Sequence, residues 1–164
     1  FGRIGQETAK IALGICMNVL FTDKFVGKTQ INLNLANDKK ISFDLESSDM
    51  TELLKNSDFV SLHVPAQKSY VIGKNEFNLM KTGAGLINAA RGGVVDEKSL
   101  IESLDSGKLA FAGVDTFENE PKPSVKLLMH PKVSLTPHIG AATNEAQDRI
   151  GIELANQIMT LVKE

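Results

Sequence analysis

The hydrophobic positions of the chain fall into short apolar runs separated by longer segments with helical periodicity. Runs of strand length occupy residues 18–23, 58–62, 85–90, 109–115 and 133–135. Helical patterns occupy residues 6–13, 49–55, 75–81, 96–106 and 143–164. Because strands alternate with helices, the pattern predicts a mostly parallel sheet with helices over both faces.

The two terminal helices have recognisable apolar stripes. In the first, the stripe consists of Ile4, Thr8, Ile11 and Ile15. In the last, it consists of Ile150, Leu154, Ile158 and Leu161, at the spacing of a long amphipathic helix. The helix after residue 95 has clear limits, since Asp96 is a good cap and Gly107 a good terminator.

One segment departs from the strand–helix alternation. Residues 30–35 and 41–45 both alternate apolar and polar side chains on either side of a polar turn at residues 36–40. This pattern predicts a β-hairpin, which we interpret as a structural elaboration without chemistry.

The first residues have the spacing of a dinucleotide-binding loop. Gly2 and Gly5 precede a helix, as the last two glycines of such a loop do, and Asp23 ends the next predicted strand. In dinucleotide-binding folds an acid at that place binds the adenosine ribose hydroxyls. The alternative is that the two glycines form an ordinary turn.

Polar side chains follow several predicted strands, and the carboxyl ends of parallel strands meet at one edge of a sheet. These side chains are Asp23, His63, Arg91, Asp115, Glu120 and His138. Histidine titrates near neutral pH, so His138 is the natural proton carrier, and a carboxylate beside it would stabilise its charged form. Arg91 could bind a substrate carboxylate with two parallel hydrogen bonds. The set suits hydride transfer between a hydroxy acid and a nicotinamide. The alternatives are that Arg91 pairs with a surface acid and that His63 bonds only to backbone.

Composition narrows the classes of protein. The 164 residues suit one domain or part of a larger protein, and 42% hydrophobic residues indicate a globular chain. A net charge of -2 without a basic stretch argues against nucleic acid, and no apolar stretch is long enough for a membrane span. The single cysteine, Cys16, fits a reducing compartment, so we expect a cytoplasmic protein without a metal site.

Four motifs carry a resemblance to a known family. They are residues 3–5, 87–97, 113–121 and 136–140, and together they resemble the D-isomer-specific 2-hydroxyacid dehydrogenases over essentially the whole chain. The resemblance implies NAD as cofactor, a small 2-hydroxy or 2-keto acid as substrate, and Arg91, Glu120 and His138 as catalytic residues. It implies cofactor contacts from Gly2, Arg3, Ile4, Gly5, Asp23, His63, Val64, Pro65, Ala89, Ala90, Arg91, Asp115, His138, Ile139, Gly140 and Ala141.

Residues 140–147 most resemble the branch of the family that acts on D-3-phosphoglycerate at the start of serine biosynthesis. A reductase of glyoxylate, hydroxypyruvate or another 2-keto acid is the alternative within the family. A non-enzymatic NAD-sensing protein of the corepressor type is the alternative outside enzymes. Residues 66–70 and the hairpin depart from the usual family pattern, which affects contacts expected from those segments.

The expected fold is therefore a doubly wound, Rossmann-type α/β sheet that lacks its first strand, because the chain begins inside the glycine loop. We expect an NAD-binding domain at residues 1–142 and, at 143–164, a helix leading back to a substrate domain. The full-length protein is expected to be a homodimer or higher homo-oligomer. Residues 1–164 alone are expected to be poorly soluble and inactive.

Overall fold

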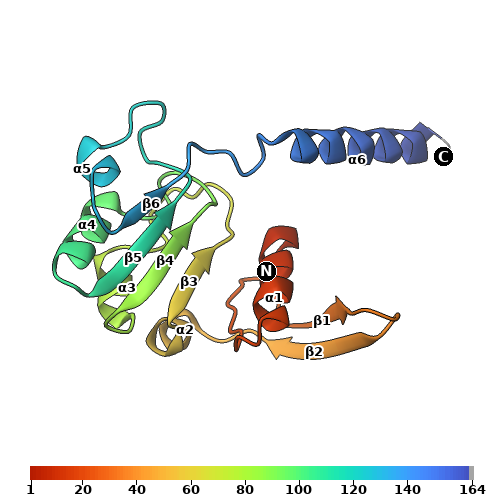
Figure 1. Ribbon diagram of the computed structural model, residues 1–164, viewed down its shortest axis with the longest axis horizontal. Helices are drawn as coiled ribbons and strands as arrows, with labels where there is room; N and C mark the ends of the chain where they lie inside the picture. Colours follow the sequence, from red (N-terminus) through yellow and green to blue (C-terminus); the bar gives the residue numbers. More distant parts are fainter. Residues whose placement is uncertain (163–164) are drawn as a thin grey trace.

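A four-stranded parallel sheet is the centre of the molecule (Figure 1). The computed structural model describes residues 1–162. The strand order is β3-β4-β5-β6, with β3 at Phe59–Leu62, β4 at Ala84–Asn88, β5 at Leu109–Val114 and β6 at Val133–Leu135. Since neighbouring strands are parallel, all four carboxyl ends lie at one edge, as the strand–helix alternation predicts.

Four helices cover one face of this sheet. They are α2 (Met50–Asn56), α3 (Lys74–Leu79), α4 (Glu97–Asp105) and α5 (Val125–Leu128). Their apolar side chains, such as Leu54, Phe77 and Leu104, form one core with alternate strand residues such as Leu86. The predicted limits of α4 are confirmed, since Asp96 caps it and Gly107 follows it with a φ of 77°. Asp49 caps α2. The short helix α5 was not predicted.

The opposite face of the sheet is open over part of its area, contrary to the expected cover on both faces. Phe59, Gly85 and Phe111 form one row across β3, β4 and β5. The Phe111 ring lies over Gly85, where a Cβ would overlap it, and the two aromatic rings are 5.9 Å apart. Phe59 and Phe111 remain 51% and 38% exposed, because no helix among residues 1–162 packs over this row.

The predicted hairpin is confirmed and forms a separate antiparallel sheet with helix α1 beside it (Figure 1). Its strands are β1 (Lys28–Asn34) and β2 (Lys40–Glu46), and α1 spans Arg3–Gly14. The predicted helix is present, but its apolar stripe is not the buried side: Ile4, Ile11 and Ile15 are 67–69% exposed, and the buried residues are Gly5 and Ala9. The small side chains let the helix backbone approach its neighbours closely.

The strand expected at residues 18–23 is wrong. Only Phe21 makes a bridge there, a parallel one to Ser47. The rest of the segment has no ladder partner among the described residues, and an unpaired strand is not stable by itself. Asp23 instead begins a turn, since its Oδ1 accepts hydrogen bonds from the N–H groups of Phe25 and Val26.

Helix α6 (Asn144–Val162) extends away from the sheet (Figure 1). None of its described residues is buried, and an ion pair joins Glu153 to Arg3 of α1. The last two residues of the predicted helix, 163 and 164, lie outside the described part. The expected boundary between an NAD-binding domain at residues 1–142 and a connecting helix at residues 143–164 stays a prediction.

Within residues 1–162, no helix combines the length and the apolar run that crossing a bilayer requires.

Candidate active site

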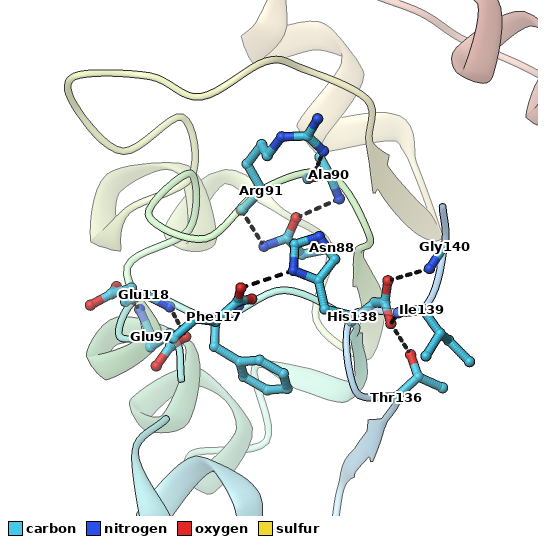
Figure 2. Close-up of polar contacts among 12 residues, drawn as sticks. Asn88, Ala90, Arg91, Glu97, Phe117, Glu118, Thr136, His138, Ile139 and Gly140 are labelled. Carbon is cyan, nitrogen blue, oxygen red and sulfur yellow. Dashed lines mark hydrogen bonds and ion pairs between the residues drawn. The ribbon is translucent and has the colours of Figure 1, made fainter. Parts of the chain in front are cut away.

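The end of β4 delivers Arg91 to the carboxyl edge of the sheet. The strand ends at Asn88, two residues before the predicted end. The buried Asn88 side chain there forms hydrogen bonds with the backbone of the next residues, in place of a strand partner. Its Oδ1 accepts from the Ala90 N–H at 3.2 Å and its Nδ2 donates to the Arg91 carbonyl at 3.1 Å (Figure 2). The turn is thereby closed by one amide, which leaves the exposed Arg91 side chain outside the core.

The end of β5 delivers Asp115, whose carboxylate holds the loop after β6. It accepts from the Thr136 hydroxyl at 2.6 Å, from the Ile139 N–H at 3.0 Å and from the Gly140 N–H at 3.2 Å. Burial raises the pKa of the Asp115 carboxyl, but these three hydrogen bonds outweigh it, so the pKa lies below its usual range. Asp115 is therefore ionised at neutral pH.

His138 is the residue that this loop presents. Its φ is 55°, a left-handed conformation that is costly for a residue with a Cβ. The bonds from Ile139 and Gly140 to Asp115 hold the backbone directly after it. Such over-determined strain is characteristic of functional positions.

A carboxylate orients the His138 ring. The Nδ1 atom of His138 lies 2.9 Å from Oε2 of Glu120 (Figure 2). The other oxygen, Oε1, accepts from the Phe117 N–H at 2.9 Å. The hydrogen bond from Phe117, followed by the contact with His138, holds the pKa of Glu120 below its usual range. With Nδ1 committed to Glu120, Nε2 is the ring atom left for a reacting group.

The Arg91 loop and the Glu120 loop touch through backbone. A Cβ built on Gly92 would overlap the carbonyl oxygen and carbon of Phe117. Only glycine permits this approach, which brings Arg91 and Glu120 into adjoining loops. A second link joins the same loops: Glu97 and Glu118 each accept the other's backbone N–H at 2.8 Å (Figure 2).

Arg91 does not face the histidine. Its Nη1 donates to the Ala90 carbonyl at 2.6 Å, and in Figure 2 the guanidinium turns away from the His138 ring. The structure thus brings together His138, Glu120 and Asp115, and places Arg91 on the next loop with its side chain folded back.

The amino end of α1 reaches the same edge beside β3. A Cβ on Gly5 would lie 3.6 Å from the Cβ of His63, at the end of β3. The His63 ring contacts the Ser61 hydroxyl at 3.0 Å, and burial lowers its pKa, which keeps it neutral. Among residues 1–162 its ring bonds to no backbone group, contrary to the alternative expectation for this residue.

The start of α1 fits an anionic group. Gly2 is the N-cap, no side chain caps the helix, and the first turn holds no acidic residue. These free N–H groups and the helix dipole suit a pyrophosphate such as that of NAD. Arg3 points to Glu153 instead, and one carboxylate oxygen of Asp23, Oδ1, is bonded within its turn. Residues 1–162 contain no group of three or more His, Cys, Asp or Glu side chains placed to hold a metal ion.

Several residues that shape the site escaped sequence reasoning. They are Asn88, Gly92, Glu97, Glu118 and Thr136. Gly92, Glu97 and Glu118 contact backbone groups that are distant in sequence, Thr136 donates to the Asp115 carboxylate, and Asn88 bonds to the backbone of its own turn. Their only sequence signal is their place inside the motifs at residues 87–97, 113–121 and 136–140.

Comparison with known proteins decides the family. Residues 1–140 match the family model described as the D-isomer specific 2-hydroxyacid dehydrogenase, NAD binding domain. The chain belongs to this family. The predicted family, Rossmann-type fold class and cofactor, NAD, are confirmed.

Relatives in this dehydrogenase family differ in substrate. A hydroxypyruvate reductase of Thermotoga maritima is 42% identical over 96% of this chain and 49% of its own length. A D-3-phosphoglycerate dehydrogenase of Archaeoglobus fulgidus is also 42% identical, over 99% of this chain and 30% of its own length. The crystal structure of a D-lactate dehydrogenase with NAD+ from Lactobacillus jensenii superposes with a TM-score of 0.76 at 32% identity, covering 99% of this chain and 51% of that one. The chain thus spans about half of the length of these relatives, or less.

The contact at Gly92 leads to a first prediction. In the full-length protein that contains this chain, Gly92→Ala is expected to lower the free energy of unfolding by about 3 kcal/mol or more, because the new methyl group meets rigid backbone at Phe117. Thermal or denaturant unfolding measures the effect. Gly27→Ala is the matched control, since its Cβ meets nothing within 4 Å, and it should stay within about 0.5 kcal/mol. Equal stability of the two variants would contradict the close approach.

The carboxylate of Asp115 leads to a second prediction. Asp115→Asn is expected to destabilise the full-length protein by about 1–3 kcal/mol at neutral pH, because an amide cannot accept all three hydrogen bonds. Since the pKa of Asp115 is lowered by folding, its contribution is present above about pH 4 and is lost as the pH falls further. The variant's stability should therefore fall less steeply in acid. Asp148→Asn, at an exposed position of α6, is the control; the same acid slope in both variants would exclude this role.

Proposed function

We propose that the full-length protein containing this chain oxidises a D-2-hydroxy acid with NAD, and that the substrate is D-3-phosphoglycerate. The observation that carries the proposal is the His138–Glu120 contact at 2.9 Å beside the Arg91 loop, at the carboxyl edge of a parallel sheet. Open α/β sheets bind ligands at that edge. The similarity of residues 140–147 to the phosphoglycerate branch of the family favours this substrate.

His138 is the proposed acid and base. With Nδ1–H donating to Glu120, the neutral ring accepts the substrate's hydroxyl proton at Nε2 during oxidation and returns it during reduction. Glu120 is ionised, since its pKa is held low, and so stabilises the imidazolium that forms. Asp115 holds the backbone that aims the ring.

Arg91 is the proposed anchor for the substrate's carboxylate. Its guanidinium has five N–H donors, of which the Ala90 carbonyl uses one. Release from that carbonyl would free the planar fork for two parallel bonds to a carboxylate. The Asn88 clamp keeps the Arg91 backbone in place while the side chain moves.

The proposed NAD site runs from α1 to the loop after β6. Gly2 to Gly5 would bind the pyrophosphate, Asp23 the adenosine ribose, and His63 to Pro65 the neighbouring part of the cofactor. Ala89 to Arg91, Asp115 and His138 to Ala141 would border the nicotinamide end. Bound NAD supplies the hydride acceptor, so the chain itself needs only to bind, orient and move one proton.

A second candidate is reduction of hydroxypyruvate or another 2-keto acid, which the similarity to the Thermotoga maritima hydroxypyruvate reductase favours. Oxidation of a 2-hydroxy acid and reduction of a 2-keto acid are the same hydride transfer in opposite directions. Both would therefore use Arg91, Glu120 and His138. They differ in the group next to the reacting carbon. We propose a cytoplasmic homo-oligomer in either case.

A substrate panel tests the function. The full-length protein is assayed with D-3-phosphoglycerate, D-glycerate and D-lactate in oxidation, and with hydroxypyruvate and glyoxylate in reduction, each with NAD(H) and NADP(H). We expect the highest kcat/KM for D-3-phosphoglycerate with NAD, and a loss of about 10²–10⁴ in kcat for His138→Ala. A preference for hydroxypyruvate would support the second candidate. NAD binding without turnover of any acid would reject both and indicate a sensor of the corepressor type.

Arg91 gives a further prediction. Arg91→Lys keeps the positive charge but loses the planar fork, so we expect kcat/KM for the hydroxy acid to fall by about 10²-fold while NAD affinity changes little. Steady-state kinetics and NAD titration measure both effects. Lys98→Arg, at an exposed position of α4, is the control and should leave both constants unchanged. Normal kinetics for Arg91→Lys would return Arg91 to a surface role.

A further inference from the structure

Glu97 and Glu118 form a reciprocal pair of hydrogen bonds. Oε1 of Glu118 accepts the Glu97 N–H at 2.8 Å, and Oε1 of Glu97 accepts the Glu118 N–H at 2.8 Å (Figure 2). The first residue opens α4, directly after the Arg91 loop, and the second lies in the loop after β5. Two short bonds therefore tie together segments that are 21 residues apart.

The arrangement has an electrostatic cost. Glu97 is only 7% exposed, and burial, together with the charges of Glu118 and Glu120, raises the pKa of its carboxyl. Two like charges close together and partly buried oppose folding. Uncharged residues that linked the same two segments would avoid this electrostatic cost. The α4 start already has a cap in Asp96, which accepts from Lys98 and Ser99. The pair is thus not needed to begin the helix.

What the pair holds is the loop of Glu120. Glu118 lies two residues before Glu120, and Phe117, which precedes Glu118, donates its N–H to Glu120 Oε1. Fixing the Glu118 backbone therefore fixes the donor that orients the Glu120 carboxylate. The same carboxylate contacts His138 through Oε2. A continuous series of hydrogen bonds leads from α4 to the His138 ring.

We propose that Glu97 and Glu118 are a pair of positioning residues that hold Glu120 against His138 for the proton step. The proposal rests on the proposed function. Neither residue touches the reacting groups; both act through the Phe117–Glu120 segment. The pair keeps the Nδ1–Oε2 distance short while Arg91, on the other side of the same junction, rearranges to take the substrate.

Variants of Glu118 in the full-length protein separate positioning from packing. Glu118→Ala removes the acceptor for the Glu97 N–H, and we expect kcat to fall roughly tenfold with KM and the NAD Kd within twofold. Glu118→Gln keeps an acceptor oxygen at the same reach and should restore most of kcat. Glu102→Ala, an exposed carboxylate on the same helix, is the matched control and should behave as the parent protein.

A second variant tests the same proposal if Glu118→Ala does not fold. Glu118→Asp keeps the charge but is one methylene too short to reach the Glu97 N–H, and should lose kcat as Glu118→Ala does. A variant that loses stability but retains kcat within twofold would assign the pair to packing alone and overturn the proposal. So would equal kcat losses in Glu118→Gln and Glu118→Ala.

A spectroscopic readout does not need activity. With 15N-labelled histidine, the His138 ring signals are assigned by their absence in His138→Asn. We expect Glu118→Ala to shift the His138 Nδ1 resonance and to speed hydrogen exchange at the Glu97 amide, with Glu118→Gln near the parent. An unchanged Nδ1 resonance would overturn positioning even if exchange increases. If the parent protein turns over no acid but these shifts appear, the proposed function fails and the positioning of Glu120 stands.

Discussion

The carboxylate of Asp115 is the group on which the geometry of the site depends. One side chain at the end of β5 accepts three hydrogen bonds from the loop after β6, and it does so on either side of His138. The bonds from Ile139 and Gly140 hold the backbone directly after the left-handed residue His138. Because the acceptor is ionised and mostly buried, each bond is stronger than a neutral one. The position of the imidazole is therefore set by charge rather than by packing.

The parallel order of the strands explains why the Asp115 carboxylate can reach the loop after β6. β4, β5 and β6 are adjacent and parallel, so the loops that follow them leave the sheet side by side. Asn88 donates and accepts within the first loop, Asp115 reaches into the third, and Glu120 reaches the third from the second. The candidate residues are placed by hydrogen bonds within and between neighbouring loops, and the side chains of Arg91 and His138 remain exposed to a ligand.

The two halves of the edge differ in rigidity. Hydrogen bonds link His138, Glu120 and Phe117 in series, whereas the Arg91 side chain bonds, within residues 1–162, only to the neighbouring Ala90 carbonyl. The His138–Glu120 pair is fixed, while the Arg91 guanidinium can turn. This arrangement suits a reaction in which Arg91 first binds the substrate's carboxylate and the proton then moves over a fixed distance to His138. It also places the cost of rearrangement on a single exposed side chain.

The sequence by itself determined most of the elements. Alternation of apolar runs and helical patterns was sufficient for β3 to β6, α2 to α4 and the hairpin, because each pattern follows from burial of one face of a local element. The motifs around Arg91, Glu120 and His138 indicated the family, since their residue types are those that the chemistry needs. The strand at residues 18–23 failed because a strand exists only with a partner, which no local pattern specifies.

Only the tertiary structure decided how the site is held. It showed that α1 buries Gly5 and Ala9 rather than its isoleucines, that Gly92 lies against the Phe117 backbone, and that Glu97 and Glu118 bond to each other. For Gly92, Glu97 and Glu118 the deciding partner is a backbone group distant in sequence, and Gly5 lies against the distant side chain of His63. Residue type and spacing encode which side chain is available, but the distance between loops arises only when the strands pair.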